Sequence, residues 1–188
     1  MKKRETKETK ISLEMDINGN GISEISTGVG FFDHMLEAFS NHSLIDLKVT
    51  CDGDLHVDAH HTVEDVGIVL GGALREQIYP IKNIERYGNA VVVMDECAVE
   101  CALDLSNRAF LVYDSIKDGY IGEFDTELVQ EFFRAVAFNA GITLHLNMLR
   151  GENKHHIAEA TFKAFAVALR RALVKNKRAG VPSTKGVL

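Results

Sequence analysis

The chain contains one short pattern twice, and this internal repeat limits the folds that are open to it. Residues 58–65 read DAHHTVED and residues 153–160 read NKHHIAEA, so each copy has two adjacent histidines with a glutamate three residues after the second. When His60 is laid over His155, the residues that follow also align, as far as a shared Ala-Leu pair. A repeat of this kind indicates that one structural unit occurs twice in the chain.

The alignment continues upstream of both copies after a shift of two residues. IDLKV at residues 45–49 aligns with ITLHL at residues 142–146. The helix-like stretch GFFDHMLEAFSNH, which begins at residue 30, aligns with ELVQEFFRAVAFN, which begins at residue 127. His34 then falls opposite Glu131, so both residues occupy the same place on matching helices.

Hydrophobic periodicity predicts the same order of elements in each half: antiparallel strands, a helix, another strand, and a helix headed by the histidine pair. In chain order these elements lie near residues 9–17, 31–41, 44–51 and 61–77, and near residues 90–105, 126–139, 143–149 and 156–174. We therefore predict an α+β fold made by tandem duplication of a small unit, a four-stranded antiparallel or mixed sheet with two helices. No linker separates the halves, so residues 1–88 and 89–188 are expected to pack as one compact body with a seam near Gly88.

Composition excludes several classes of function. The chain has 27 acidic and 21 basic residues and a net charge of −6, which disfavours general binding to nucleic acid or to an anionic membrane. A polar N-terminus and the lack of any apolar run of about 18 residues argue against a signal peptide and a membrane span. Cys51, Cys97 and Cys101 form no CxxC pair, so we expect reduced thiols in a cytoplasmic protein.

The doubled histidines and glutamates predict metal sites. In a helix, residues four apart share a face whereas the next residue lies about 100° away. His60 and Glu64 can therefore hold one ion while His61 points toward another, and His155, His156 and Glu159 repeat this arrangement. Imidazole and carboxylate without thiolate suit a borderline or hard divalent ion, with Mn²⁺ the first choice and Fe²⁺, Co²⁺ or Zn²⁺ as substitutes. His34 and Glu131 are candidates for further ligands.

Other polar residues near the repeats are open to more than one interpretation. Asp58 and Asp65 either accept hydrogen bonds from ligand imidazoles or are solvated surface charges. His56 and His145 have strand-like surroundings, which favours a structural role for both. Lys163 lies four residues beyond Glu159 and eight beyond His155, so it projects to the side of the helix that carries the metal ligands.

Taken together, these stretches resemble imidazoleglycerol-phosphate dehydratase of histidine biosynthesis. The similarity includes GFFDHML, HVDAHHTVEDVG, IERYG, LSNRAF, LHLNMLRGENKHHIAEATFKAFAVALRRAL and PSTKGVL, and so extends over nearly the whole chain. The resemblance implies a duplicated unit like the second domain of a small-subunit ribosomal protein, and two Mn²⁺ ions in each active site. It also implies trimers assembled into a shell of 24 subunits, with active sites between subunits.

The resemblance also implies roles for individual residues. Glu8, His60 and His155 would be catalytic, with Glu8 as the base that removes a carbon-bound proton. Metal ligands would be His34, His60, His61, Glu64, Glu131, His155, His156 and Glu159. The substrate and its phosphate would be bound by Glu8, His34, His42, Arg86, Arg108, Lys163, Ser183, Thr184 and Lys185, the last three in a C-terminal tail that closes over the substrate.

The implied reaction is the removal of water from imidazole glycerol phosphate to give imidazole acetol phosphate, a carbon–oxygen hydro-lyase step. No carbonyl lies next to the proton that is lost, so the imidazole ring must accept the charge, through an imidazolate and a diazafulvene-like intermediate favoured by metal ions. Two other functions remain open from the residues alone: a dinuclear hydrolase of phosphate esters, and a metal-storing or structural shell protein.

Overall fold

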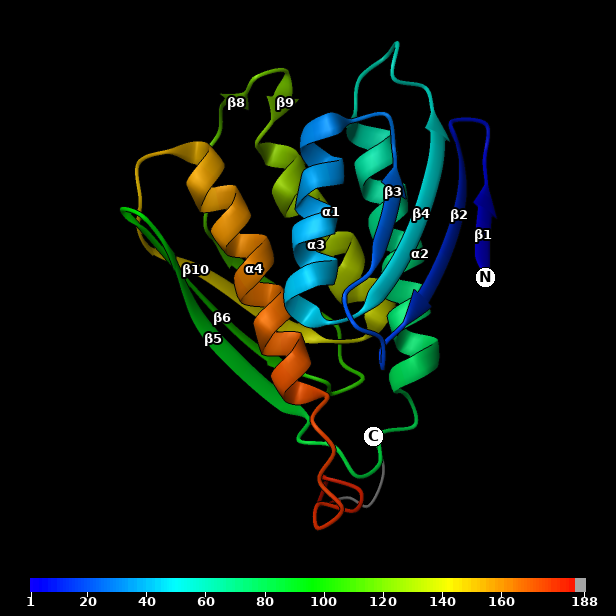
Figure 1. Ribbon diagram of the computed structural model, residues 1–188, viewed down its shortest axis with the longest axis vertical. Coiled ribbons are helices and arrows are strands. Elements are labelled where there is room, and N and C mark those ends of the chain that lie inside the picture. Colours follow the sequence, from blue (N-terminus) through cyan, green and yellow to red (C-terminus); the bar gives the residue numbers. More distant parts are fainter. Residues whose placement is uncertain (185–188) are drawn as a thin grey trace.

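The computed structural model describes residues 1–184 of the chain, and these residues form two four-stranded sheets with four helices between them (Figure 1). The strands are β1 (Lys2–Glu5), β2 (Thr9–Asp16), β3 (Ser23–Ser26), β4 (Asp46–Gly53), β5 (Tyr87–Met94), β6 (Cys97–Asp104), β7 (Phe110–Asp114), β8 (Tyr120–Ile121), β9 (Phe124–Asp125) and β10 (Thr143–Arg150). The helices are α1 (Gly30–Ser43), α2 (His60–Ile78), α3 (Glu127–Ala140) and α4 (Lys154–Ala172).

The two sheets have the same topology, which confirms the predicted α+β duplication. Their strand orders are β1-β2-β4-β3 and β5-β6-β10-β7, and in each sheet one edge strand runs parallel to its neighbour. Ile25 of β3 pairs with Val49 of β4, and Val112 of β7 pairs with His145 of β10. The sheets are therefore mixed. The boundary after residue 88 stays a prediction, and β5 begins at Tyr87.

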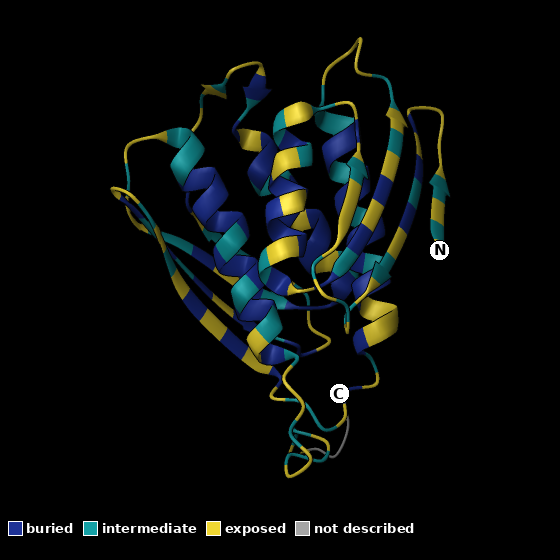
Figure 2. Cartoon of the chain, viewed as in Figure 1, coloured by how far each residue is buried: buried dark blue, intermediate teal, exposed yellow. Residues whose placement is uncertain are grey.

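Side chains from the helices fill the space between the sheets, and buried and exposed residues alternate along the strands (Figure 2). Phe132, Phe133, Phe162 and Phe165 lie at the centre of this layer. Their ring centroids are 4.8–5.4 Å apart between α3 and α4. Contacts of this kind contribute about 0.5–1.5 kcal/mol each beyond the apolar area that they bury. Rings also meet across the halves: Phe32 of α1 lies 5.3 Å from Phe132, and Phe39 of α1 lies 5.6 Å from Phe165, so the two halves share one core.

Glycines allow α2 to pack closely on α3. A Cβ at Gly71 would lie 2.7 Å from the carbonyl oxygen of Val136, and one at Gly67 would lie 2.9 Å from the Cβ of Ala135. These two glycines are one helical turn apart and so face the same neighbour. In α3 the chain then leaves the helix at Gly141, which adopts the left-handed conformation with φ of 70°.

All four helices begin at the same end of the molecule, at the top of Figure 1, and the C-terminal segment lies at the opposite end. Side chains fix two of these starts. The Oδ1 atom of Asp58 accepts the backbone N–H of His60 at 2.8 Å, and that of Asn153 accepts the N–H of His155 at 2.9 Å. Each histidine pair is thus held in a first helical turn. Within residues 1–184, no helix has the length and apolar character needed to cross a membrane.

Candidate metal centre and substrate site

Three of the predicted ligands come together at the end where the helices begin. The Nε2 atoms of His34 and His155 lie 3.4 Å and 3.2 Å from Oε2 of Glu159. One ligand atom from each of the three residues lies within 4.8 Å of the others. His34 comes from α1 in the first half, and the other two residues come from α4 in the second half. The group is therefore formed by contact between the two halves.

The carboxylate of Glu159 is buried, with 7% of the residue exposed, and it is paired with a cation. Lys163 Nζ lies 2.6 Å from its Oε1. Burial acts to raise the pKa of Glu159, but the hydrogen bond and charge of Lys163 and the nearby His34 outweigh it and lower the pKa. The carboxylate is therefore ionised and can act as a ligand.

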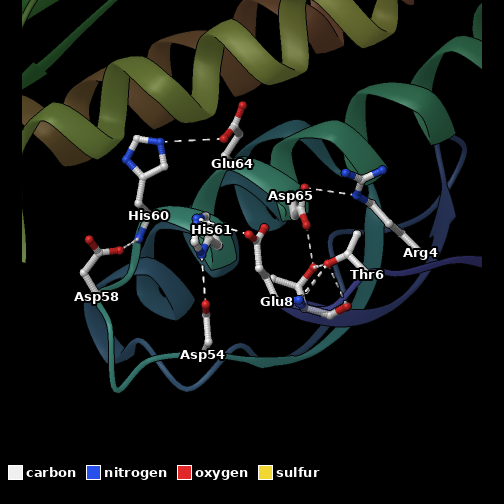
Figure 3. A network of polar contacts seen from close by, with 10 residues as sticks. Arg4, Thr6, Glu8, Asp54, Asp58, His60, His61, Glu64 and Asp65 are labelled. Atoms are coloured by element: carbon white, nitrogen blue, oxygen red, sulfur yellow. Dashed lines mark hydrogen bonds and ion pairs between the residues drawn. The ribbon is translucent and has the colours of Figure 1, made fainter.

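The first histidine pair forms a second cluster at the start of α2 (Figure 3). His60 Nε2 lies 3.6 Å from Oε2 of Glu64, one turn further along the helix. The neighbouring His61 turns away: its Nδ1 lies 3.0 Å from a carboxylate oxygen of Asp54, and its Nε2 lies 3.9 Å from Oε1 of Glu8. The side chain of Glu8 is about half exposed.

Open space adjoins this second cluster. A cavity of about 620 Å³ lies between the starts of α1 and α2 and the β8–β9 hairpin. Its lining includes His60, Phe31, Tyr120 and Phe124. The side chain of His60 therefore borders a space large enough for a small molecule or for protein side chains.

His156 follows the same scheme as His61. Its Nδ1 lies 2.8 Å from Oε2 of Glu96, and its Nε2 lies 3.9 Å from the exposed Asp95. The hydrogen bond with His156 and backbone N–H donors lower the pKa of Glu96 to about 2. In both pairs, then, a carboxylate holds the Nδ1 side of the second histidine.

Glu131, opposite His34 in the repeat, makes an ion pair with Arg134 at 3.2 Å. Over residues 1–184, only one group of three or more His, Cys, Asp or Glu side chains is close enough to share a metal ion. This group is His34, His155 and Glu159. The remaining predicted ligands, His60, His61, Glu64, Glu131 and His156, do not form a closed set within one chain.

Within residues 1–184, the two aspartates beside the first pair, Asp58 and Asp65, make no hydrogen bond to an imidazole. Asp58 caps the start of α2. Asp65 is buried, so the solvated alternative is wrong for it: its oxygens accept from Arg4 Nε at 3.0 Å and from the hydroxyl of Thr9. Sequence reasoning missed Asp54 and Glu96, the carboxylates that do hold imidazoles.

The histidines outside the pairs differ in setting. His42 lies in the last turn of α1, and burial, followed by the charges of Lys163 and Arg170, lowers its pKa. His145 lies in β10, as predicted. His56 lies in an exposed turn after β4, so its predicted strand-like surroundings are wrong because the strand already ends at Gly53.

The predicted phosphate-binding arginines lie near the C-terminal segment. Arg86 is buried, its Nε and Nη2 lie 2.6 Å and 2.9 Å from the oxygens of Asp104, and its Nη1 donates to the carbonyl of Pro182 at 2.6 Å. The side chain of Arg108 is 76% exposed and lies 3.9 Å from Asp104. Ser183 and Thr184 directly follow Pro182, and Lys185 lies outside the described residues.

Within one folded chain, Arg86 and Arg108 lie at the end of the molecule opposite the metal ligands. The backbone N–H of Arg86 donates to the carbonyl of Ala172, the last residue of α4, at 3.0 Å, whereas His155 lies in the first turn of that helix. A helix of 19 residues is about 28 Å long at 1.5 Å per residue. One chain therefore cannot bring both groups to a single small substrate.

Comparison with known proteins identifies the chain's family. A family model described as imidazoleglycerol-phosphate dehydratase matches residues 27–169. The chain belongs to the imidazoleglycerol-phosphate dehydratase family. Members of this family in Campylobacter hominis and Campylobacter concisus are 71% and 68% identical to it, over 100% and 98% of this chain and 98% and 95% of the relatives.

Solved structures of imidazoleglycerol-phosphate dehydratases have the same fold. The enzyme from Staphylococcus aureus is 42% identical, with a TM-score of 0.82 over 93% of this chain and 98% of that one. The enzyme from Pyrococcus furiosus, solved in complex with (S)-C348, is 41% identical, with a TM-score of 0.86 over the full length of both chains. The chain is accordingly a hydro-lyase of histidine biosynthesis.

Proposed function

We propose that the chain dehydrates imidazole glycerol phosphate to imidazole acetol phosphate with two Mn²⁺ ions in each active site. The observation that carries this proposal is the meeting of His34, His155 and Glu159 from two halves of the chain. The donor atoms fit such an ion, since they are imidazole nitrogen and carboxylate oxygen. Burial raises the pKa of Cys51 to about 11, so this thiol stays protonated and does not compete as a ligand.

The internal repeat suggests how the ligands divide between the ions. His34, His155 and Glu159 would hold one ion, and the matching residues Glu131, His60 and Glu64 would hold the other. His61 and His156 have their Nδ1 atoms engaged, which leaves Nε2 as the atom that can bind metal. We infer that these two imidazoles complete sites shared with neighbouring subunits.

The protein groups have distinct parts in the reaction. When bound, the ions supply Lewis acids that favour loss of the substrate's ring N–H proton, so that the ring electrons can expel the adjacent hydroxyl group. Glu8 is the base that removes the neighbouring C–H proton, and its half-exposed carboxylate next to His61 supports this role. The electrons of the C–H bond return to the ring, which regains its N–H proton, so that the net loss of one water gives an enol, which becomes the ketone. His60 and His155 would take part as residues that hold the ions beside the substrate's ring.

The phosphate group needs cations away from the ring. Arg108 presents an exposed guanidinium, which can donate two hydrogen bonds to phosphate oxygens. Arg86 bonds to both Asp104 and Pro182 and so positions the segment that contains Ser183 and Thr184. Lys185, which is also proposed to bind the phosphate, lies outside the described residues. Lys163, which pairs with Glu159, would contact the substrate beside the metal ligands together with His34. His42, in the last turn of α1, would contact it further along α4.

Arg86 and Arg108 can reach the substrate only from another subunit, because about 28 Å of α4 separates them from the metal ligands of their own chain. This separation supports the proposal that active sites lie between subunits, in trimers that assemble into a shell of 24. The three cysteines are all free, which agrees with the proposal that the enzyme acts in the reducing cytoplasm.

Metal removal and reconstitution test the proposed function. We expect that exhaustive chelation abolishes formation of the ketone from imidazole glycerol phosphate and that Mn²⁺ restores it, with two bound ions per chain by elemental analysis. His155→Ala should lower the metal content, whereas His145→Ala, an exposed residue of β10, should retain it. Full turnover by the metal-free protein would refute the proposal, and release of free phosphate would indicate a hydrolase.

A further inference from the structure

The two halves use different residues to hold their second histidine. Asp54, directly after β4, lies 3.0 Å from Nδ1 of His61. Glu96, in the turn before β6, lies 2.8 Å from Nδ1 of His156. In the repeat, Glu96 matches Glu8 rather than Asp54, because Glu8 directly precedes β2 as Glu96 directly precedes β6.

The place that matches Asp54 in the second half is Gly151, which cannot supply a carboxylate. Its φ of 155° disfavours other residues. A Cβ there would lie 2.8 Å from Cγ1 of Ile157 and 3.1 Å from Sγ of Cys97. Both neighbours belong to the buried core, so they cannot move aside easily. The group that holds His156 must therefore come from another element.

Glu96 is fixed on both sides by the start of α4. Its Oε1 accepts the backbone N–H groups of Asn153 at 2.9 Å and of Glu152 at 3.3 Å, and its Oε2 faces the imidazole. One carboxylate thus joins the β5–β6 turn, the loop before α4 and His156. Glu8, in contrast, has its nearest ring nitrogen at 3.9 Å.

We propose that Glu96 is a positioning residue that accepts a hydrogen bond from Nδ1–H of His156 and so directs the lone pair of Nε2 toward a metal ion. This inference rests on the proposed metal chemistry. A carboxylate behind a ligating imidazole fixes its tautomer and its ring orientation. The matched glutamates have thus taken different tasks: Glu8 remains available for proton transfer, and Glu96 is committed to a ligand.

Metal affinity provides the test, because a base alters turnover but not binding of the ion. We expect Glu96→Ala to weaken Mn²⁺ binding by roughly 10–100-fold, as the loss of such partners does elsewhere, and Glu96→Gln to weaken it less. Free Mn²⁺ would be followed by electron paramagnetic resonance during titration of the metal-free protein. The control is Glu152→Ala, which removes one negative charge from the adjoining loop before α4 and should leave affinity within about twofold.

The possible outcomes separate this inference from the function on which it rests. If the native chain binds no Mn²⁺, the proposed function itself fails. If the native chain binds Mn²⁺ and Glu96→Ala binds it equally well, only the role of Glu96 is refuted. An equal loss in Glu96→Ala and Glu152→Ala would show a general charge effect and would also overturn it. Circular dichroism of each variant, with Glu96→Gln as the milder change, separates lost binding from lost folding.

Discussion

At the scale of single residues, adjacent histidines have different surroundings because a helix turns between them. The ring planes of His60 and His61 differ by 79°, and those of His155 and His156 by 84°. In each pair the first imidazole faces a glutamate on its own helix, and the second faces a carboxylate from a loop. The five-residue pattern His-His-x-x-Glu, at residues 60–64 and 155–159, therefore presents its imidazoles in two directions.

Glu8→Gln tests the proposed base at this scale. The amide keeps the size and hydrogen-bonding ability of the side chain but cannot accept a proton. We expect kcat to fall by about 10²–10⁴-fold, with substrate and metal affinity nearly unchanged, measured by steady-state assay and by calorimetry.

The control for this variant is Glu14→Gln, which removes a charge from β2 away from the histidines. It should retain normal turnover. A Glu8→Gln variant with near-normal kcat would exclude Glu8 as the base.

The sequence pointed to the histidines but not to the residues that orient them. His60, His61 and Glu64 are recognisable because helical spacing alone relates them. The contact between Glu96 and His156 joins residues 60 positions apart, and no local pattern records it. The meeting of His34 with Glu159 likewise depends on the packing of α1 on α4, which periodicity does not determine.

At the scale of elements, the helices were predictable and the short strands were not. The predicted helices match α1 to α4 within two residues at each end, because each has an extended apolar stripe. β1, β3 and β7 have five residues or fewer, which is too short for alternation to be distinctive. The parallel pairing of β3 with β4 also depends on the path of the chain through α1.

The close contact between α2 and α3 gives a prediction for stability. Gly71→Ala places a Cβ 2.7 Å from the carbonyl oxygen of Val136 and 3.1 Å from the backbone nitrogen of Ala140, so the helices must separate. We expect the free energy of unfolding to fall by about 1–3 kcal/mol in chemical denaturation.

Gly72 in the same helix provides a matched comparison. A Cβ there would meet only the flexible end of Lys2, which can move into solvent. Gly72→Ala should therefore leave stability unchanged or raise it by up to about 1 kcal/mol, since alanine favours the helix. Equal effects of the two substitutions would show that α2 and α3 do not pack closely.

At the scale of the whole molecule, residues 1–184 form one fold in which the proposed metal ligands and the proposed phosphate-binding arginines do not meet. Repeat analysis predicted the duplicated architecture, since both halves follow one pattern of elements. It did not reveal that the predicted phosphate-binding arginines lie at the far end of α4 from the metal ligands, because spacing along the chain does not report the direction in which each element runs.

Co-expression of two inactive variants tests whether subunits share sites. If His61 and Arg108 of one active site come from different chains, then assemblies mixed from His61→Ala and Arg108→Ala subunits regain activity at about one quarter of their sites. Differently tagged chains, purified through both tags, would provide the mixed assemblies. Activity no higher than in either variant alone would place both residues in one chain.

The contact of α1 with α4 suggests how such an enzyme could have arisen. His34 belongs to the first unit, and its partners His155 and Glu159 belong to the second. Two separate copies of an ancestral half-length protein, associated in the same way, would already have brought these donors together. Gene fusion then had only to join the copies, after which each unit was free to diverge, as the different contacts of Glu8 and Glu96 illustrate.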